Sequence, residues 1–363
     1  MASPKTCPAP STANTDPLSS GDLYSAALAF VRGELQVTGD LIEAVRSAVK
    51  GCRRNWRHKL MARLSPLRLE SWLQTRSRAV ANIRSHYDRS NDFYRQFLDS
   101  RMVYSCAYFK EPEWGLDRAQ LAKLDYICRK LELERGERFL DIGCGWGALV
   151  CHAASAYGAA ASGCTLSLEQ YDYAARAIAA ERLESRAVVL MRDYRDLDGK
   201  FDKIASVGMF EHVGRRRLRG YFRWVNTLLA DRGLFLNHGI MRPQGTSESV
   251  ESLLRRKVFP GGELPHLGDV IREAENAGFE VLDVENLRPH YALTCRAWVE
   301  RLRANEAACL EQVDAKTYRT WLLFLAGSAV NFEDGQIDVY QVLMAKRNFP
   351  MPRKYNREHM RVP

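Results

Sequence analysis

One glycine-rich loop constrains the fold more than any other feature of this sequence. The loop Asp141-Ile-Gly-Cys-Gly-Trp-Gly147 follows a short apolar run at 138–143 and precedes a helical pattern at 148–157. Further apolar runs alternate with helical patterns, and they lie at 159–165, 187–191, 203–208 and 233–240. This alternation predicts a parallel sheet with helices on both faces. Because ligands bind such sheets at the carboxyl ends of the strands, we expect the loop to line a ligand site.

The remaining patterns extend this α/β unit on both sides. Helices are expected at 21–48, 118–133 and 217–229, and after the fifth apolar run we expect a strand near 279–287. Two helices should follow at 295–312 and 314–328, with a closing strand at 336–346.

The length of 363 residues accommodates one large domain and a smaller one. Residues 1–20 are rich in Pro, Ser, Thr and Ala and contain no apolar core, so we interpret them as a disordered leader and not as a secretory signal. We predict a small, basic, helical N-terminal domain at 21–78, an α/β domain at 79–348 and a basic tail at 349–363.

Cysteines and uncharged runs bear on the compartment. The nine cysteines form no CxxC pair and have no spacing typical of zinc sites, which argues for reduced cytoplasmic thiols and against a metal site or a disulfide framework. The uncharged run 142–168 is rich in glycine, and the apolar run 321–332 is too short to span a bilayer. We therefore expect a cytoplasmic protein that is at most peripheral to a membrane.

Positive charge is concentrated in one segment. Residues 46–84 contain eleven Lys or Arg and a single acid, Glu70, interleaved with Trp and Leu. This pattern predicts helices that lie on an anionic membrane surface. The alternatives are a solvated basic face over an ordinary core helix, and a nucleic-acid site, which the absence of a recognisable nucleic-acid motif disfavours.

The spacing within the glycine loop narrows the class of cofactor that the loop can bind. Its pattern is G-x-G-x-G and not the G-x-G-x-x-G of dinucleotide-binding loops, and the second strand ends in Thr165-Leu166-Ser167 without the acid that usually holds a nicotinamide cofactor's ribose. The loop resembles the first motif of class I S-adenosylmethionine-dependent methyltransferases. That resemblance implies that the loop cradles the methionine end of S-adenosyl-L-methionine.

Other stretches follow in a consistent order. They are YSCAYF (104–109), TLSLEQ (165–170), DYRDL (193–197), GMFEHVG (208–214), NHGI (237–240), VFPGGELP (258–265) and RPHYALT (288–294). Together they resemble the cyclopropane-fatty-acid synthase family, including its mycolic-acid-modifying relatives, over about residues 80–346. The upstream stretch 30–41 resembles the small N-terminal domain of longer bacterial members. Many members carry a cysteine where Leu325 stands, a position that we interpret as packing.

The resemblance implies a reaction. The alkene of an unsaturated acyl chain in a phospholipid attacks the methyl group of S-adenosylmethionine, and loss of a proton from that methyl closes a cyclopropane ring. An alkene is a weak nucleophile, so the rate must come from placement and from stabilising positive charge. In the family a bicarbonate ion acts as the base. The resemblance implies that its holders, our predicted catalytic residues, are Cys106, Glu211, His238, Ile240 and Tyr291.

The cofactor contacts carry over in the same way. Tyr104 and Ser105 are implied above the methionine moiety, and the ribose is implied between Thr165, Leu166 and Gln170. The remaining implied contacts are Gly143 and Gly145 beneath the methionine, the further loop residues Asp141 and Gly147, and Asp193, Tyr194 and Arg195 around the adenine.

Several alternatives stay open from the sequence. The same scaffold supports methylation that leaves a methyl-branched lipid, and plant alkaloid N-methyltransferases, which methylate amines, share YSC-, FEH- and HYA-type stretches. A catalytically silent lipid-binding protein is a third alternative. The expected partners are a phospholipid substrate at an anionic membrane surface and a possible second copy in a homodimer, with no nucleic acid. An apolar channel for the acyl chain is expected from Leu253, Val258, Phe259, Leu264, Leu267, Leu322, Leu323 and Phe324.

Overall fold

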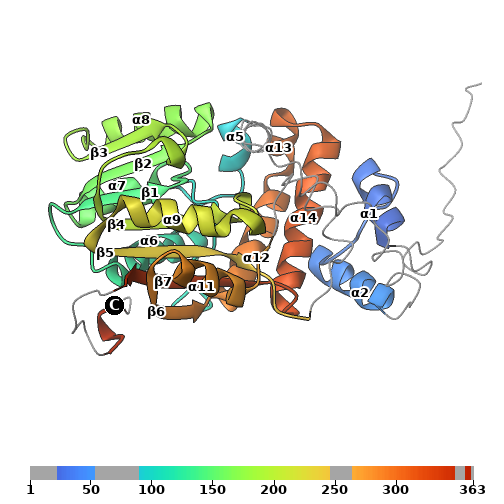
Figure 1. Cartoon of the computed structure of the whole chain (residues 1–363). Coiled ribbons are helices and arrows are strands. Elements are labelled where there is room, and N and C mark those ends of the chain that lie inside the picture. Colours follow the sequence, from blue (N-terminus) through green and yellow to red (C-terminus); the bar gives the residue numbers. More distant parts are fainter. Residues whose placement is uncertain (1–22, 54–89, 246–263, 348–355, 361–363) are drawn as a thin grey trace, which may run out of the picture.

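A seven-stranded mixed sheet forms the centre of the computed structural model, which describes residues 23–53, 90–245, 264–347 and 356–360. The sheet order is β3-β2-β1-β4-β5-β7-β6 (Figure 1). The strands are β1 (Arg138–Ile142), β2 (Ala160–Thr165), β3 (Ala187–Met191), β4 (Phe201–Val207), β5 (Leu229–Met241), β6 (Phe279–Asn286) and β7 (Asp338–Lys346). The first five strands pair in parallel with one another, which confirms the α/β fold expected from the alternating pattern.

The last two strands depart from a wholly parallel sheet. Strand β7 pairs antiparallel with both β5 and β6, so it lies between two strands that precede it in the sequence. The alternation of apolar runs carries no information on strand direction, because a buried strand reads the same in either orientation. The alternating pattern therefore predicted the parallel strands of this α/β sheet but gave no sign of the antiparallel pairing of β7.

Helices cover both faces of the sheet. Helices α6 (Leu116–Lys130), α7 (Ala148–Ala156) and α8 (Leu168–Ala180) share one hydrophobic cluster with the sheet, and α9 (Leu218–Leu228) and α11 (Leu267–Asn276) share another. The expected helix at 295–312 is two helices, α12 (Arg288–Ala304) and α13 (Glu306–Gln312). Helix α12 begins earlier than predicted because Pro289 lies in its first turn, where a missing N–H costs nothing.

A third cluster is built beyond the end of the sheet. It joins α5 (Asn91–Arg95), α12 and α14 (Ala315–Glu333), and it contains Leu325, whose predicted packing role is thereby confirmed. The short 3₁₀ helices are η4 (Tyr194–Asp196), η5 (Phe210–His212), η6 (Arg215–Arg217) and η7 (Glu358–Met360). No helix among the described residues is long and apolar enough to cross a bilayer.

The N-terminal helices α1 (Leu23–Arg32) and α2 (Leu41–Arg53) pack against α14, on the side away from the sheet (Figure 1). Ala27 and Val31 of α1 contact Leu323, and Leu41 and Ile42 of α2 belong to the third cluster. The division into four segments stays a prediction. Its leader, the 78/79 boundary and most of the tail lie outside the described residues, as does the basic stretch from 54 to 84.

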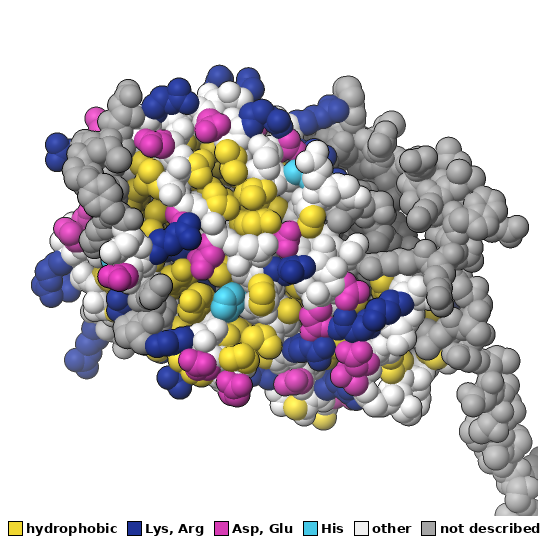
Figure 2. Space-filling view, turned by 90° about the horizontal axis from the view of Figure 1, so that it is seen from below, with side chains coloured by type: hydrophobic (Ala, Val, Ile, Leu, Met, Phe, Trp, Pro, Cys, Tyr) yellow, Lys and Arg dark blue, Asp and Glu magenta, His cyan; other side chains and the backbone are white. Residues whose placement is uncertain are grey.

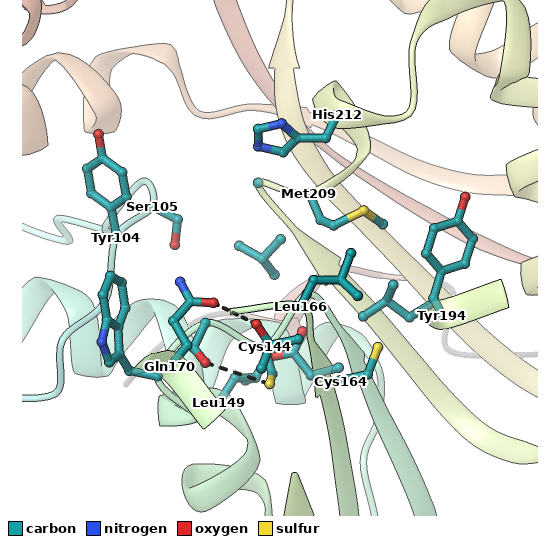
Figure 3. Close-up of a pocket in the computed structure, with 18 of the residues that line it drawn as sticks. Tyr104, Ser105, Cys144, Leu149, Cys164, Leu166, Gln170, Tyr194, Met209 and His212 are labelled. Atoms are coloured by element: carbon teal, nitrogen blue, oxygen red, sulfur yellow. Dashed lines mark hydrogen bonds between the residues drawn. The ribbon is translucent and has the colours of Figure 1, made fainter. Parts of the chain in front are cut away.

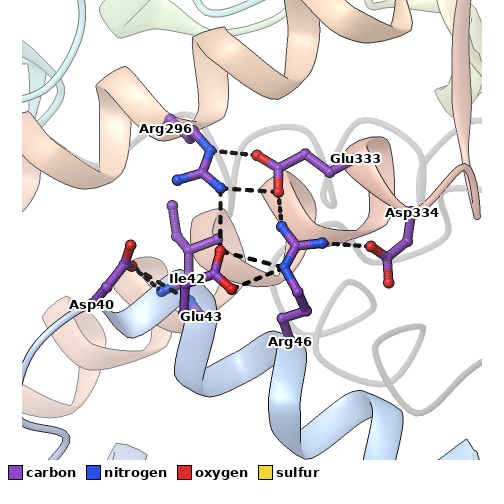
Figure 4. A network of polar contacts seen from close by, with 7 residues as sticks. All are labelled: Asp40, Ile42, Glu43, Arg46, Arg296, Glu333 and Asp334. Atoms are coloured by element: carbon purple, nitrogen blue, oxygen red, sulfur yellow. Dashed lines mark hydrogen bonds and ion pairs between the residues drawn. The ribbon is translucent and has the colours of Figure 1, made fainter.

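A polar network fastens α2 to the end of α14 (Figure 4). The Arg46 guanidinium binds the Glu333 carboxylate and donates to Asp334 Oδ1 at 2.5 Å. Arg296 of α12 also binds Glu333, and Glu43 accepts from Arg46 at 3.2 Å. The Arg46 side chain is only 17% exposed, so these bonds are partly shielded from water.

Replacing Arg46 should loosen this attachment. We expect Arg46→Met to lower the free energy of unfolding by about 1–3 kcal/mol, because it removes one cation from two partly buried carboxylates, of which Glu333 keeps Arg296. Amide hydrogen exchange should accelerate in α1 and α2 before the sheet is affected. The matched control is Lys50→Met, which removes an exposed cation from the same helix. Equal stability of the two variants would contradict the proposed attachment.

Candidate active site

A pocket opens at the carboxyl ends of β1, β2 and β4, where the sequence predicted a ligand site (Figure 3). The glycine loop forms its floor. Gly143 has a φ of +80°, and a Cβ there would lie 2.6 Å from Cγ of Met209, which also lines the pocket. A side chain at this position would therefore be strained and would push Met209 out of place.

Eleven of the twelve expected cofactor residues line this pocket. They are Tyr104, Ser105, Asp141, Gly143, Gly145, Thr165, Leu166, Gln170, Asp193, Tyr194 and Arg195. Gly147 is the exception, because it precedes α7 with a φ of +88° and faces α8, where a Cβ would lie 2.8 Å from the Ala174 Cβ. Gly147 packs the loop closely against that helix, and a contact between Gly147 and the cofactor stays a prediction.

The side chain of Gln170 is oriented by its neighbour. Thr165 Oγ1 accepts a hydrogen bond from the backbone N–H of Ser167 at 3.2 Å, and its own hydroxyl donates to Gln170 Oε1 at 2.7 Å. The amide nitrogen of Gln170 then points away from Thr165 (Figure 3). The pocket thus presents an N–H donor where many methyltransferases carry an acid, and such a donor suits a ribose hydroxyl oxygen.

The opposite end of the pocket holds Asp193 and Tyr194. The Asp193 carboxylate accepts from Arg195 at two side-chain nitrogens, at 2.8 and 2.5 Å, and from the Arg195 backbone N–H at 3.0 Å. Burial raises the pKa of Tyr194 to about 12, so the ring stays a neutral phenol. Trp224 Nε1 donates to the Tyr194 carbonyl at 2.8 Å, which fixes this turn against α9.

A buried lysine in this pocket escaped the sequence-based prediction. Lys123 lines the pocket from α6 and is 2% exposed, and its Nζ donates to Ser105 Oγ at 3.0 Å. The signal was present, because Lys123 falls on the face of the helix that also carries the apolar Leu124 and Ile127. A lysine on a buried face needs a partner or a function.

Burial also perturbs the acid of the glycine loop. It raises the pKa of Asp141 to about 7, although the nearby Lys123 charge acts in the opposite direction. Burial lowers the pKa of Lys123 to about 8, against the raising effect of Asp99 and Asp141. His212, which also lines the pocket, has a pKa lowered to about 4 by burial and is therefore neutral at pH 7.

The five predicted catalytic residues lie behind the wall of the pocket and not in it. Cys106 follows the lining residue Ser105, and Glu211 lies between the lining residues Met209 and His212. His238 and Ile240 occupy alternate positions near the end of β5, so their side chains share one face of the sheet. Tyr291 is in α12, where its ring stacks on Phe332 at 4.4 Å.

Two of these residues are in direct contact. Glu211 Oε1 accepts the backbone N–H of Ile240 at 2.7 Å, and the Glu211 carboxylate is 8% exposed. Gly239 permits this contact, because a Cβ there would lie 1.9 Å from Cε1 of Phe210 and 3.1 Å from Glu211 Oε1. Helix η5 therefore packs directly against the backbone of β5.

Burial keeps His238 and Cys106 uncharged. It lowers the pKa of His238 well below its usual value, and the charges of Lys123 and Lys130 act in the same direction. It raises the pKa of the Cys106 thiol well above its usual value. His238 Nδ1 lies 3.3 Å from Gln341 Nε2, while His238 Nε2 is buried without a hydrogen-bond partner among the described residues.

The described residues contain no group of three or more His, Cys, Asp or Glu arranged to hold a metal ion. The seven cysteines whose side chains are described are all free thiols.

The pocket carries polar groups that suit S-adenosylmethionine. Asp141 Oδ1 is buried there without a hydrogen-bond partner among the described residues, and it faces the same pocket as the Lys123 ammonium.

Similar proteins agree with this arrangement. The family profile described as "Mycolic acid cyclopropane synthetase" matches residues 74–342. The chain is 43% identical over 328 residues to a "Probable fatty acid methyltransferase" of Pseudomonas putida, covering 88% of this chain and 81% of that protein. It is 38% identical over 275 residues to the "Cyclopropane-fatty-acyl-phospholipid synthase" of Escherichia coli strain K12, covering 76% of this chain and 70% of that protein.

A solved structure shares the fold. The structure of mycolic acid cyclopropane synthase CmaA1 complexed with SAH and CTAB superposes with a TM-score of 0.71 at 35% identity, covering 74% of this chain and 98% of that one. The residues matched by the family profile include the glycine loop and the ends of the parallel strands. The chain therefore belongs to the mycolic acid cyclopropane synthetase family of S-adenosylmethionine-dependent methyltransferases.

Proposed function

We propose that the chain transfers a methylene group from S-adenosylmethionine to the double bond of unsaturated acyl chains in phospholipids, forming cyclopropane fatty acids. The observation that carries this proposal is the burial of Glu211, which lies between two residues of the pocket wall, and of His238, whose carbonyl accepts the N–H of the lining residue Gly208. The relative from Escherichia coli is named for this reaction, and it aligns with 76% of this chain.

The reaction requires a dry site. When bound, S-adenosylmethionine supplies an electrophilic methyl group on a sulfonium. As the alkene takes that methyl, the second alkene carbon becomes electron-poor, and water there would give an alcohol instead of a ring. Tyr104 lies beside the apolar rings of Trp298 at 5.1 Å and Tyr94 at 5.8 Å. These π faces can stabilise positive charge while excluding water.

Ring closure needs a proton acceptor near the new methyl group. A bicarbonate ion fits the polar groups here. His238 Nε2 is a buried nitrogen without a partner among the described residues, and the buried Glu211 carboxylate contacts β5 two residues further on, at the Ile240 N–H. Glu211, His238 and Tyr291 would hold the ion and supply its orientation. The backbone N–H of Ile240, another implied holder of the ion, donates to Glu211 in this structure, so an ion that uses this N–H requires a shift of Glu211.

The acyl chain needs an apolar path to this site. Of the residues expected to form one, Leu323 packs against α1 and Leu267 packs against the α9 side of the sheet, so both are core residues. Leu322 and Phe324 belong to or pack against the cluster that surrounds Tyr104. Leu253, Val258 and Phe259 lie outside the described residues, and their role stays a prediction.

We also propose that the substrate is reached at an anionic membrane surface. On the face shown in Figure 2, the described residues carry acidic and basic side chains side by side around hydrophobic areas. That face therefore offers no block of positive charge among them. The proposal rests on the basic residues between 54 and 84, which lie outside the described part, since Arg46 is already engaged by acids. A homodimer stays a prediction.

Lipid mass spectrometry tests the proposed reaction. The chain would be expressed in a bacterial host that makes monounsaturated but no cyclopropane lipids. We expect phospholipid acyl chains that gain the mass of one CH2 and no longer react with ozone, because the double bond has become a ring. The variant Glu211→Gln serves as the control for host enzymes.

The same measurement distinguishes a second candidate function from ring formation. The relative from Pseudomonas putida is named a fatty acid methyltransferase without mention of a ring, which makes methyl branching that candidate. A gain of CH2 with ozone reactivity retained would identify branching next to a surviving double bond. Unchanged lipids together with methylation of an added amine would overturn the lipid proposal.

A further inference from the structure

Two oppositely charged side chains are buried in the cofactor pocket without satisfying each other. Lys123 from α6 is 2% exposed and Asp141 from the end of β1 is 3% exposed, and both line the pocket. Within the described part of the chain, Lys123 has no carboxylate within 4.0 Å, and its ammonium donates only to Ser105 Oγ. Asp141 Oδ1 likewise has no hydrogen-bond partner there. Burying charges of this kind costs free energy unless a bound ligand pairs with them.

A second lysine of the same helix shows what a purely structural role looks like. Lys130 is 1% exposed, and its ammonium binds Glu285 at 2.5 Å and Asp283 at 3.4 Å. It does not line the pocket. Helix α6 thus carries one buried lysine whose charge is neutralised by the protein and one, Lys123, whose donors face the cofactor site.

The methionine end of S-adenosylmethionine is a zwitterion, with an α-ammonium and an α-carboxylate on one carbon. A wall that presents an ammonium and a carboxylate is complementary to both groups. We propose that Lys123 binds the α-carboxylate of the cofactor's methionine moiety, with Asp141 facing its α-ammonium. This inference rests on the assignment of the cofactor but not on the identity of the methyl acceptor.

The surroundings of Lys123 keep its side chain in place. Gln120, one turn earlier in α6, donates to the carbonyl oxygens of Ser105 at 2.9 Å and Val103 at 3.4 Å. Helix α6 therefore fastens the segment 103–105, which also lines the pocket, and Ser105 in turn accepts from Lys123. With its pKa near 8, Lys123 is mostly protonated at neutral pH and is able to pair with an anion.

Calorimetric binding to the full-length chain tests this assignment. The probes are S-adenosylmethionine, decarboxylated S-adenosylmethionine and 5′-methylthioadenosine, which lacks the amino-acid end. The wild-type chain should bind S-adenosylmethionine about 10- to 100-fold more tightly than the decarboxylated form. In Lys123→Met this preference should vanish, while the affinity for 5′-methylthioadenosine stays within about twofold, because only the carboxylate contact is lost.

A further variant separates this role from a structural one. Lys130→Met removes a buried charge from the same helix and should lower stability without changing the preference between the probes. If Lys123→Met does not fold, the comparison of the two probes on the wild-type chain decides, and equal affinities there overturn the proposal.

The remaining outcomes are also distinct. If Lys123→Met weakens all three probes equally, Lys123 is structural and the proposal is wrong. If the folded wild-type chain binds none of the three probes, the cofactor assignment fails instead, and the role of Lys123 falls with it.

Discussion

Glu211→Gln should lower the rate of methyl transfer by about 100-fold or more while leaving the affinity for S-adenosylmethionine within about threefold. The carboxylate of Glu211 is buried, and one of its oxygens is held by the backbone N–H of Ile240 at 2.7 Å. Glutamine has the same shape, so it keeps that bond but removes the negative charge and one acceptor. Because Glu211 does not line the pocket, we expect the substitution to leave the affinity for the cofactor nearly unchanged.

The measurement is a single-turnover assay on vesicles that contain unsaturated phospholipid, with cofactor affinity determined by calorimetry. The matched control is Glu137→Gln, a partly buried glutamate before the amino end of β1, where its carboxylate accepts the Glu134 N–H at 2.8 Å. That variant should retain turnover. Parallel losses of rate and of cofactor affinity in Glu211→Gln would mean that Glu211 supports the fold and takes no part in the chemistry.

Gly239→Ala is expected to destabilise the protein by about 3 kcal/mol or more, because the added methyl has no room. Its Cβ would lie 1.9 Å from the Phe210 ring. The ring belongs to η5, so relief of the clash must move the helix that carries Glu211. We therefore expect turnover to fall more steeply than stability alone explains.

Chemical denaturation and the same turnover assay measure the two effects. Gly220→Ala in α9 is the control, since no atom lies within 4 Å of its added Cβ, and a helical Gly-to-Ala change should stabilise by up to about 1 kcal/mol. The double variant Gly239→Ala with Phe210→Leu should recover part of the lost stability. A Gly239→Ala protein as stable and active as the wild type would contradict the close packing of η5 on β5.

The cofactor pocket was predictable because its parts are local. The loop from Asp141 to Gly147 and the stretch from Thr165 to Gln170 each follow a strand directly, and β1, β2 and β4 end at one edge of the sheet. Once the strands are recognised, the residues after them must meet there. The glycine motif alone did not show that the missing side chain of Gly147 makes room for Ala174.

The set behind the pocket could not be derived in this way. Cys106, Glu211 and Tyr291 come from distant parts of the chain, and only the family resemblance associated them. Neither the contact between Glu211 and Ile240, 29 residues apart, nor the antiparallel entry of β7 has a local signal. Lys123 looked like one more charged residue in a helical pattern.

The pattern of apolar runs and glycines was sufficient to specify the α/β architecture, the place of the cofactor loop and most of the pocket wall. Those features depend on backbone geometry and burial over a few residues, and the residue types of a short segment indicate both. Which polar groups lose their water, and which find a partner when they do, depends on packing between segments that are far apart in the chain. For that reason the unpartnered charges of Lys123 and Asp141 and the neutral state of His238 emerged only from the folded structure.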